Sequence, residues 1–347
     1  MNIERVSFLL DSPAIGGGGE YLRQLSDGLP AWCESRVFFS SRGECTAGAV
    51  NAWRPDIIHV NHLRALAQLF GNPFRRPKAP VVFVVHGIHL RKYDFLPRTV
   101  GNRARRFLRL TLERFLYRKC AALVVLTETD CAEVLRLYGR DLNVVCIPNG
   151  APAARPRTPS EPKFPADGFA FICVGRFDFQ KGQDVLLGAI AKSAQELRSH
   201  GRRTLFIGGG KMLPELEAFA DSHGIQDLVE FAGELPNAAD YLACGRILVA
   251  PSRWEGLPFL LMEAGLQEKM VIASDCPGNH DLVQDGVSGR LFPVEDVDAL
   301  ARLLIQEWRP DTLQSFGDAL YQHVQADYSR EQMCARTLAL WRSLKLQ

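Results

Sequence analysis

The sequence lacks the features that mark several common classes of protein. No apolar stretch in its 347 residues reaches the roughly 20 residues that a membrane-spanning helix needs. The segment MNIERVSFLLDSP has no basic n-region and no small-residue cleavage site, so we expect a first strand at 6–10 and no signal peptide. A net charge of +2 argues against bulk nucleic-acid binding. These absences predict a globular protein located in the cytoplasm.

Paired cysteines and metal-binding patterns are also missing. The nine cysteines contain no C-x-x-C pair, their number is odd, and several, including Cys146, Cys173 and Cys244, sit in apolar runs. This distribution favours reduced core thiols over a disulfide framework. No histidine has metal-site spacing with a partner carboxylate, so we expect no metal and no other cofactor.

A proline-rich segment divides the chain into two similar halves. Residues 151–168, APAARPRTPSEPKFPADG, hold five prolines and little apolar content, as linkers do. We predict an N-terminal domain over 1–155, a linker over 156–168, a second domain over 169–323 and a terminal helix over 324–347.

Each half alternates short Val/Ile/Leu runs with helical stretches, a pattern typical of parallel α/β sheets buried on both faces. The predicted strands are 6–10, 36–39, 57–60, 81–85, 123–126 and 144–147 in the first half, and 169–174, 204–207, 228–231, 247–250 and 270–273 in the second.

Two glutamates in the second half lie where a ligand of such a sheet is expected. Glu255 and Glu263 sit eight positions apart around a Gly-Leu-Pro turn, after the predicted strand 247–250. Pro258 suits the first turn of a helix, and ligands bind where strands lead into helices. The alternative is that Glu255 caps the helix and Glu263 is a solvated helix residue.

Two cations follow the first strand of the same half. Arg176 and Lys181 bracket a loop between strand 169–174 and a helix that begins near Gly182. A guanidinium fork and a compact ammonium together suit a departing diphosphate, although both side chains could instead be ordinary surface residues.

The first half offers a glycine loop and a histidine. Gly17 and Gly18 belong to a four-glycine run that opens a helix after the first strand, and His86 follows the strand 81–85. Bare N–H groups at a helix start can receive a phosphate. The run is not G-x-G-x-x-G, and it has no Walker lysine. A ligand-free loop and a loop histidine bonded to backbone are the alternatives, and a structural role is favoured for His59 and His62.

These segments resemble the motifs of glycosyltransferase family 4. The matching residues are Ser252, Glu255, Gly256, Pro258, Glu263 and Ala264 for S-x-x-E-G-x-P-x-x-x-x-E-A, 174–176 with 181–182 for V-G-R…K-G, Phe231 and Gly233 for F-x-G, and Gly17, Gly18 and Glu20 for G-G-x-E. The resemblance implies the GT-B fold, α/β with two Rossmann-like doubly wound parallel-sheet domains facing a cleft, and a retaining enzyme with a nucleotide-sugar donor.

The resemblance also implies a role for each matched residue. Glu255, His86, Arg176 and Lys181 would be the catalytic group, with the two cations on the diphosphate and Glu255 and His86 near the sugar. Donor-binding residues would be Gly17, Gly18, Phe231, Gly233, Gly256, Leu257, Phe259 and Glu263, the last on the ribose hydroxyls. Pro258 has no N–H and cannot donate there. The last helix would cross back to the N-terminal domain.

The segment 91–119 is strongly basic, with ten lysines and arginines against Asp94 and Glu113. Leu108, Leu112 and Phe115 share a helical face with Ala104, which we expect to pack on the sheet. The remaining basic side chains predict contact of Arg103–Lys119 with an anionic membrane surface, which would place the protein peripherally on the inner face of the cell membrane.

Three departures from the family pattern leave the sugar unidentified: no aspartate follows Pro148-Asn149-Gly150, Glu268-Lys269-Met270 replaces the glycine-x-proline, and Asp281 replaces a glutamate. We predict a retaining glycosyltransferase that moves a hexose-type sugar from a UDP- or GDP-linked donor to a glycan or lipid-linked glycan. The alternatives are a GT-B nucleotide-sugar epimerase and a non-catalytic nucleotide-sugar-binding protein.

Overall fold

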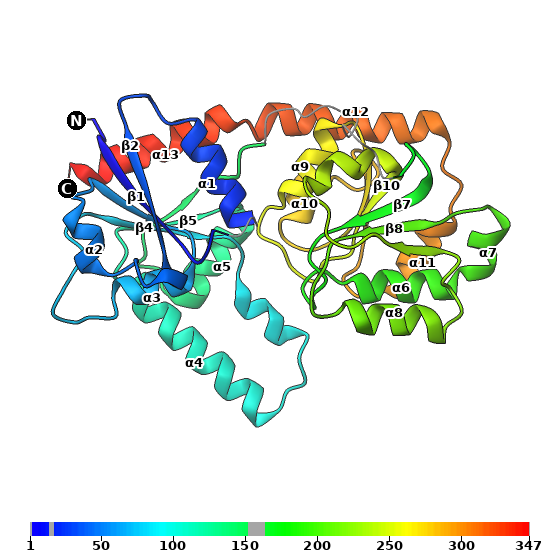
Figure 1. Cartoon of the computed structure of the whole chain (residues 1–347), viewed down its shortest axis with the longest axis horizontal. Coiled ribbons are helices and arrows are strands. Elements are labelled where there is room, and N and C mark those ends of the chain that lie inside the picture. The colour runs from blue at the N-terminus through cyan, green and yellow to red at the C-terminus, as the bar shows by residue number, and fades with distance from the viewer. Residues whose placement is uncertain (1, 14–16, 152–163, 347) are drawn as a thin grey trace. The chain divides into compact units, whose positions relative to one another are not determined.

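The chain forms two compact α/β units. The computed structural model describes residues 2–13, 17–151 and 164–346, so Gly16 and residues 156–163 of the predicted linker lie outside the described residues. Unit 1 comprises Met1–Gly150 together with Tyr328–Gln347, and unit 2 comprises Ala151–Asp327. Figure 1 shows a twisted sheet with flanking helices in each unit.

Unit 1 is built on a six-stranded parallel sheet in the order β2-β1-β3-β4-β5-β6. Its central strands are apolar and buried because helices cover both faces. The strands are β1 (Arg5–Leu10), β2 (Glu34–Phe39), β3 (Ile57–Val60), β4 (Val81–Val85), β5 (Ala122–Val125) and β6 (Val144–Cys146).

Five helices of unit 1, α2, α3, α4, α5 and α13, begin at side chains that cap free N–H groups. Thr127 accepts from the amide of Asp130, and Ser329 accepts from that of Gln332. The helices are α1 (Gly17–Asp27), α2 (Ala47–Ala52), α3 (Leu63–Leu69), α4 (Val100–Tyr117), α5 (Glu128–Tyr138) and α13 (Arg330–Lys345), with 3-10 turns η1 (Ser40–Arg42) and η2 (His89–Asp94).

Helix α13 lies on unit 1 although it ends the chain. Lys345 forms an ion pair with Asp56 at 2.7 Å, and Trp341 is fully buried. The break between α12 and α13 falls near Ser329, later than the boundary at 324 that the sequence predicted.

Unit 2 repeats the architecture in the order β12-β11-β10-β7-β8-β9, again with parallel pairing. Its strands are β7 (Phe169–Val174), β8 (Thr204–Ile207), β9 (Val229–Phe231), β10 (Gly245–Ala250), β11 (Met270–Ser274) and β12 (Arg290–Phe292). Its helices are α6 (Gln183–Lys192), α7 (Ala194–Ser199), α8 (Leu213–Ser222), α9 (Phe259–Leu266), α10 (Asn279–Leu282), α11 (Val297–Ile305) and α12 (Pro310–Asp327), with the 3-10 turn η3 (Ala238–Cys244).

The predicted α/β fold is confirmed, and every strand that the sequence predicted is present within a residue or two. The strand β12 was missed because its apolar run is only Leu291-Phe292, between Arg290 and Pro293. Pro258 precedes the first turn of α9, one position earlier than expected.

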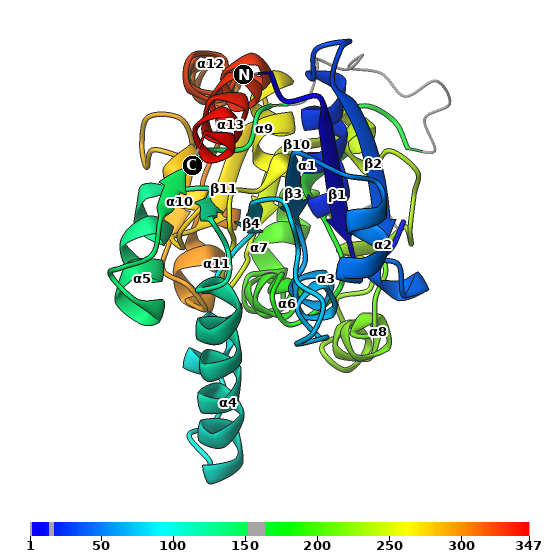
Figure 2. The same cartoon turned by 90° about the vertical axis from the view of Figure 1, so that its left-hand side faces the viewer.

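The prediction for the basic helix α4 was wrong in one respect. Leu108, Leu112 and Phe115 were expected to pack on the sheet, yet all three are exposed. Only the last turns of α4 reach the core of unit 1, where Leu116 and Tyr117 are buried. Figures 1 and 2 show the rest of the helix extending away from the sheet.

No helix within the described ranges is long and apolar enough to cross a bilayer. The nine cysteines are free thiols, and five of them are buried.

Candidate active site

The strand order of unit 2 creates a switch point between β7 and β10. From β7 the chain proceeds outward to β8 and β9, and then returns to place β10 on the other side of β7. Loops at such a point diverge and leave room for a ligand at the carboxyl ends of the strands. Arg176 and Lys181 lie in the loop after β7, and Ser252 and Glu255 lie in the loop after β10.

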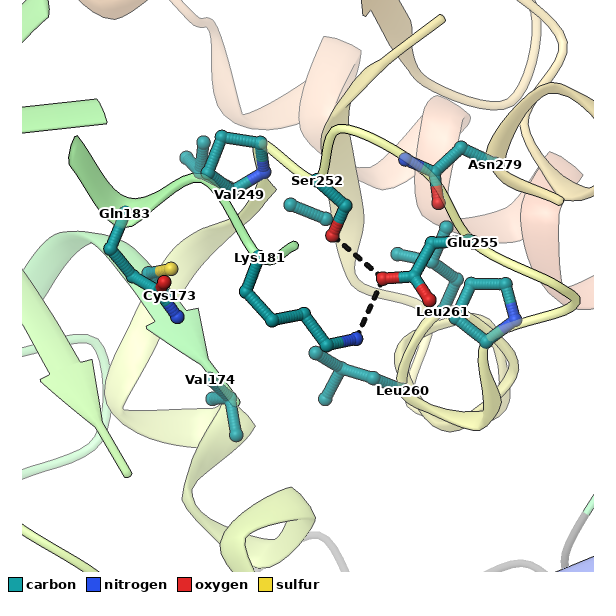
Figure 3. A pocket seen from close by; sticks show the side chains of 13 residues that line it. Cys173, Val174, Lys181, Gln183, Val249, Ser252, Glu255, Leu260, Leu261 and Asn279 are labelled. Atoms are coloured by element: carbon teal, nitrogen blue, oxygen red, sulfur yellow. Dashed lines mark hydrogen bonds and ion pairs between the residues drawn. The ribbon is translucent and has the colours of Figure 1, made fainter. Parts of the chain in front are cut away.

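Lys181 and Glu255 meet across this switch point (Figure 3). Nζ of Lys181 donates to Oε1 of Glu255 at 2.6 Å, and Oγ of Ser252 donates to the same oxygen at 2.7 Å. Lys181, Ser252 and Glu255 line one pocket, and the Glu255 side chain is almost wholly buried. The buried carboxylate is therefore held by an ammonium and a hydroxyl group.

Arg176 lies in the same loop as Lys181, between β7 and α6, and is exposed at the surface. Its side chain is 68% exposed, and Nε donates to Oδ2 of Asp178 at 2.5 Å. Asp178 also accepts from the amide of Gln180, so it stabilises the turn that carries both cations. The guanidinium keeps most of its surface open to a ligand in solution.

No motif in the sequence indicates that Arg253 joins the two loops. Its buried guanidinium donates to both carboxylate oxygens of Asp184, at 3.0 and 2.6 Å, and to Glu295 at 2.7 Å. It also donates to the carbonyl of Phe179 and lies over the Phe179 ring, 4.0 Å from its centroid. Because these partners lie far apart in sequence, spacing could not have revealed the contact.

Two glycines allow the loops to approach one another closely. Gly182 has φ 67°, and a Cβ added there would overlap the carbonyl oxygen of Pro251. Gly278 has φ 87°, and its Cβ would overlap the carbonyl oxygen of Gly256. Any L side chain would both strain the backbone and push apart the segments around Lys181 and Glu255.

Two buried side-chain amides that line the same pocket have unused polar atoms. Nδ2 of Asn279 donates to the carbonyl of Ser274, and Nε2 of Gln183 donates to that of Arg176. The oxygens Oδ1 of Asn279 and Oε1 of Gln183 have no hydrogen-bond partner among the described residues. Both side chains line the pocket in Figure 3, where each free oxygen could accept a hydrogen bond from a hydroxyl group.

The other residues predicted to bind a donor take different positions in unit 2. Glu263 is half-buried on the second turn of α9, and Gly256, Leu257 and Phe259 lead into that helix. The ring of Phe231 packs against Phe206 and Phe177, and the residue is partly buried. Gly233 has φ 74° and accepts from the amide of Gly208.

Unit 1 brings together its own predicted residues at the switch point between β1 and β3. A Cβ on Gly18 would lie 3.9 Å from Nε2 of His86, which shows how close the first turn of α1 comes to this imidazole. Nε2 of His86 is 3.1 Å from Oδ1 of Asn61, and the Tyr21 ring meets His86 edge-on. Gly17 opens the same turn.

Burial keeps His86 and the neighbouring His59 neutral. Removal from water, together with repulsion from His89 and His62, lowers the pKa of His86 to about 4. The indole of Trp341 donates to Nδ1 of His59, so Nε2 of His59 carries the proton and lies 3.3 Å from Oη of Tyr21. His59 and the α3 cap His62 are therefore structural residues.

Comparison with known protein families matches most of the chain. The family described as glycosyl transferases group 1 matches residues 168–308, and the glycosyl transferase 4-like domain matches residues 28–150. A curated relative, the lipopolysaccharide core biosynthesis mannosyltransferase LpcC of Rhizobium leguminosarum bv. viciae, is 29% identical over 180 residues. That match spans 50% of this chain and only 50% of the relative's length.

Solved structures share the fold over almost the whole chain. Sucrose-phosphate synthase from Thermosynechococcus elongatus aligns with a TM-score of 0.78 at 21% identity, over 98% of this chain and 99% of that chain. Anabaena Alr3699/HepE in complex with UDP and glucose aligns with a TM-score of 0.77 at 17% identity, over 98% and 100%. With both family matches and two parallel six-stranded sheets, the chain belongs to the family 4 type of glycosyltransferases, enzymes of the GT-B fold.

Proposed function

We propose that this glycosyltransferase moves a hexose-type sugar from a nucleotide-diphosphate sugar to a glycan or lipid-linked glycan, with retention of configuration at the anomeric carbon. The observation that carries the proposal is the pairing of Lys181 with Glu255 at the switch point of unit 2. It places a cation and a carboxylate side by side where the strands of such a sheet leave room for a ligand.

The two cations would receive the diphosphate. An ammonium has three N–H donors, and Lys181 uses one of them on Glu255, which leaves two for phosphate oxygens. Arg176 can add a planar fork from the exposed rim of the loop. Positive charge at this point stabilises the phosphate that departs in the transition state, so no metal is required.

The remaining residues would hold the two ends of the donor. Glu263 on α9 would accept the ribose hydroxyls, and the backbone at Phe231 and Gly233 would meet the base. Glu255 and the amides of 256, 257 and 259 would hold the sugar. In unit 1, Gly17, Gly18 and His86 would contact the transferred sugar, with His86 acting as a neutral hydrogen-bonding group because of its low pKa.

Retention at this site would proceed without a covalent glycosyl intermediate, because the described lining of the pocket lacks a second acid. Of the described residues that line the pocket, Glu255 alone carries a carboxylate, and it is engaged by Lys181 and Ser252. A double-displacement glycosidase would need two carboxyl groups about 5 Å apart. We therefore propose attack from the face of the leaving group, with the departing phosphate accepting the proton of the acceptor hydroxyl.

The relatives support the substrate classes. LpcC is named as a mannosyltransferase of lipopolysaccharide core biosynthesis, and HepE was solved with UDP and glucose. Glycan acceptors and nucleotide-linked hexoses are therefore the first compounds to test.

The test incubates the purified chain with a panel of UDP- and GDP-linked hexoses, with and without oligosaccharide acceptors, in buffer containing EDTA. We expect transfer to an acceptor, and an unchanged anomeric configuration in the proton NMR spectrum of the product. An inverted product, a requirement for divalent metal, or isomerisation of the donor without acceptor would each contradict the proposal. The last result would identify an epimerase.

A further inference from the structure

Helix α4 of unit 1 presents its apolar face to solvent. The positions 100, 104, 107, 108, 111, 112 and 115 recur every three or four residues and so share one side of the helix. The large apolar side chains on that side are exposed, namely Val100 (85%), Phe107 (67%), Leu108 (67%), Leu112 (46%) and Phe115 (57%). Figures 1 and 2 show this helix reaching away from the sheet.

The opposite side of α4 faces unit 1, and it holds the acid of the helix. Glu113 is buried, accepts from Nε of Arg109 at 2.7 Å, and accepts from Oη of Tyr138 at 2.6 Å. The contacts that hold α4 on unit 1 are therefore the Arg109–Glu113 ion pair and the buried side chains of Leu116 and Tyr117. The exposed apolar side chains of the helix do not take part in them. Arg109 belongs to this inner contact, so it is not part of the outer surface that the sequence predicted.

Basic side chains border the exposed apolar face. Arg103 lies along one edge of it and Arg105 along the other, and both are exposed. Arg118 and Lys119 follow at the end of the helix, where Nζ of Lys119 lies 4.0 Å from the centroid of the Phe115 ring. Because the acid Glu113 points inward, the outer surface of α4 carries positive charge alone.

We propose that α4 docks the enzyme on an anionic lipid bilayer, with Phe107, Leu108, Leu112 and Phe115 entering the boundary between headgroups and acyl chains. Flanking arginines then lie at the depth of the lipid phosphates. An apolar stripe with cationic edges is the composition of helices that lie in the plane of a membrane interface.

A second copy of this chain fits the same surface poorly. Two copies of α4 packed face to face would bring Arg103 and Arg105 near the same residues of the partner, with no acid on the outer surface to compensate. An anionic bilayer offers both an apolar interior and the opposite charge. The positive charge around the apolar face of α4 therefore favours binding to an anionic bilayer over association with a second copy of the chain.

The experiment is co-sedimentation of the full chain with vesicles of equal parts phosphatidylglycerol and phosphatidylcholine, and with phosphatidylcholine alone. We expect binding to the anionic vesicles and a loss of roughly tenfold or more in the double variant Phe107→Ser/Leu108→Ser. Its matched control, Val287→Ser/Ile305→Ser, removes two exposed apolar residues from unit 2 and should bind like the parent. Arg103→Ser/Arg105→Ser should also bind more weakly, whereas Arg246→Ser/Arg302→Ser should not.

Equal vesicle binding by the parent and Phe107→Ser/Leu108→Ser would overturn the proposal, as would a parent that binds neither vesicle. A concentration-dependent dimer in analytical ultracentrifugation, lost in that variant and accompanied by no vesicle binding, would identify a second copy as the occupant. Binding of nucleotide diphosphates should be unchanged in all α4 variants, so this result is independent of the proposed donor chemistry.

Discussion

Lys181 and Glu255 form one ion pair between loops that follow different strands, with Nζ 2.6 Å from Oε1. The lysine side chain is a quarter exposed and the glutamate side chain almost wholly buried, so the carboxylate fixes the lysine from the protein side. The ammonium can then meet a phosphate oxygen without first being ordered, which reduces the entropy that binding would cost.

Removal of a phosphate-binding cation should weaken nucleotide-diphosphate binding. We expect Lys181→Ala and Arg176→Ala each to lose about 1.5–3 kcal/mol of binding free energy, the range for charge-assisted hydrogen bonds. Calorimetric titration with UDP and GDP measures this change. The control Arg246→Ala removes an exposed arginine of unit 2 and should leave affinity unchanged; equal losses in control and test variants would refute a specific diphosphate site.

Loss of Arg253 should destabilise unit 2. Its removal leaves Asp184 and Glu295 without their common partner, and because both acids remain partly exposed we expect a loss of about 2–3 kcal/mol, below the value for a fully buried pair. Urea denaturation gives the change. The matched control is Arg198→Ala, since Arg198 also pairs with both oxygens of an aspartate but at the surface. An equally small effect in both variants would show that burial of Arg253 contributes nothing.

Substitution of Gly182 separates two effects: the close approach of this residue to Pro251, and the strain of its positive φ. Gly182→Ala places a Cβ at positive φ and against Pro251, whereas Gly201→Ala places one at a similar φ of 61° with no atom within 4 Å. The left-handed conformation costs an alanine about 1 kcal/mol in either variant. We expect Gly182→Ala to be clearly the less stable of the two in urea and to bind UDP more weakly. If Gly182→Ala and Gly201→Ala had similar stability and unchanged affinity for UDP, the close approach of Gly182 to Pro251 would have no role.

The buried histidines predict a loss of stability in mild acid. In the unfolded chain an imidazole takes up its proton near about pH 6.5, but in the fold His86 does so near 4 and His59 near 3. Between these values the unfolded chain binds more protons, so the free energy of unfolding falls as the pH decreases, by up to about 1.4 kcal/mol per pH unit for each group.

The variant His86→Asn isolates one of these groups. Urea midpoints measured between about pH 7 and pH 5 should fall less steeply with decreasing pH than in the parent. The exposed residue His200 is the control, because His200→Asn should keep the parental slope. A parental slope in His86→Asn would show that His86 is protonated equally in the folded and unfolded chains.

The central strands could be predicted because a parallel strand covered by helices on both faces is apolar throughout. The runs 81–85 and 270–273 therefore stand out from their surroundings, whereas the three residues of β12 do not. The loops that carry Lys181 and Glu255 follow from the same logic, since each comes directly after such a run.

Contacts between distant segments could not be predicted in this way. Helical periodicity shows that α4 has an apolar side, but it does not show whether protein covers that side, and Phe107 and Leu108 are in fact uncovered. Arg253 likewise acts through Asp184 and Glu295, and nothing in the local sequence indicates that these three residues meet.

The most direct measurement of the central claim is a crystal structure of the chain with UDP or GDP bound. We predict that the β-phosphate oxygens lie within hydrogen-bonding distance of Nζ of Lys181 and of the Arg176 guanidinium, with the ribose hydroxyls on Glu263. A nucleotide bound elsewhere, with no phosphate near either cation, would contradict the account.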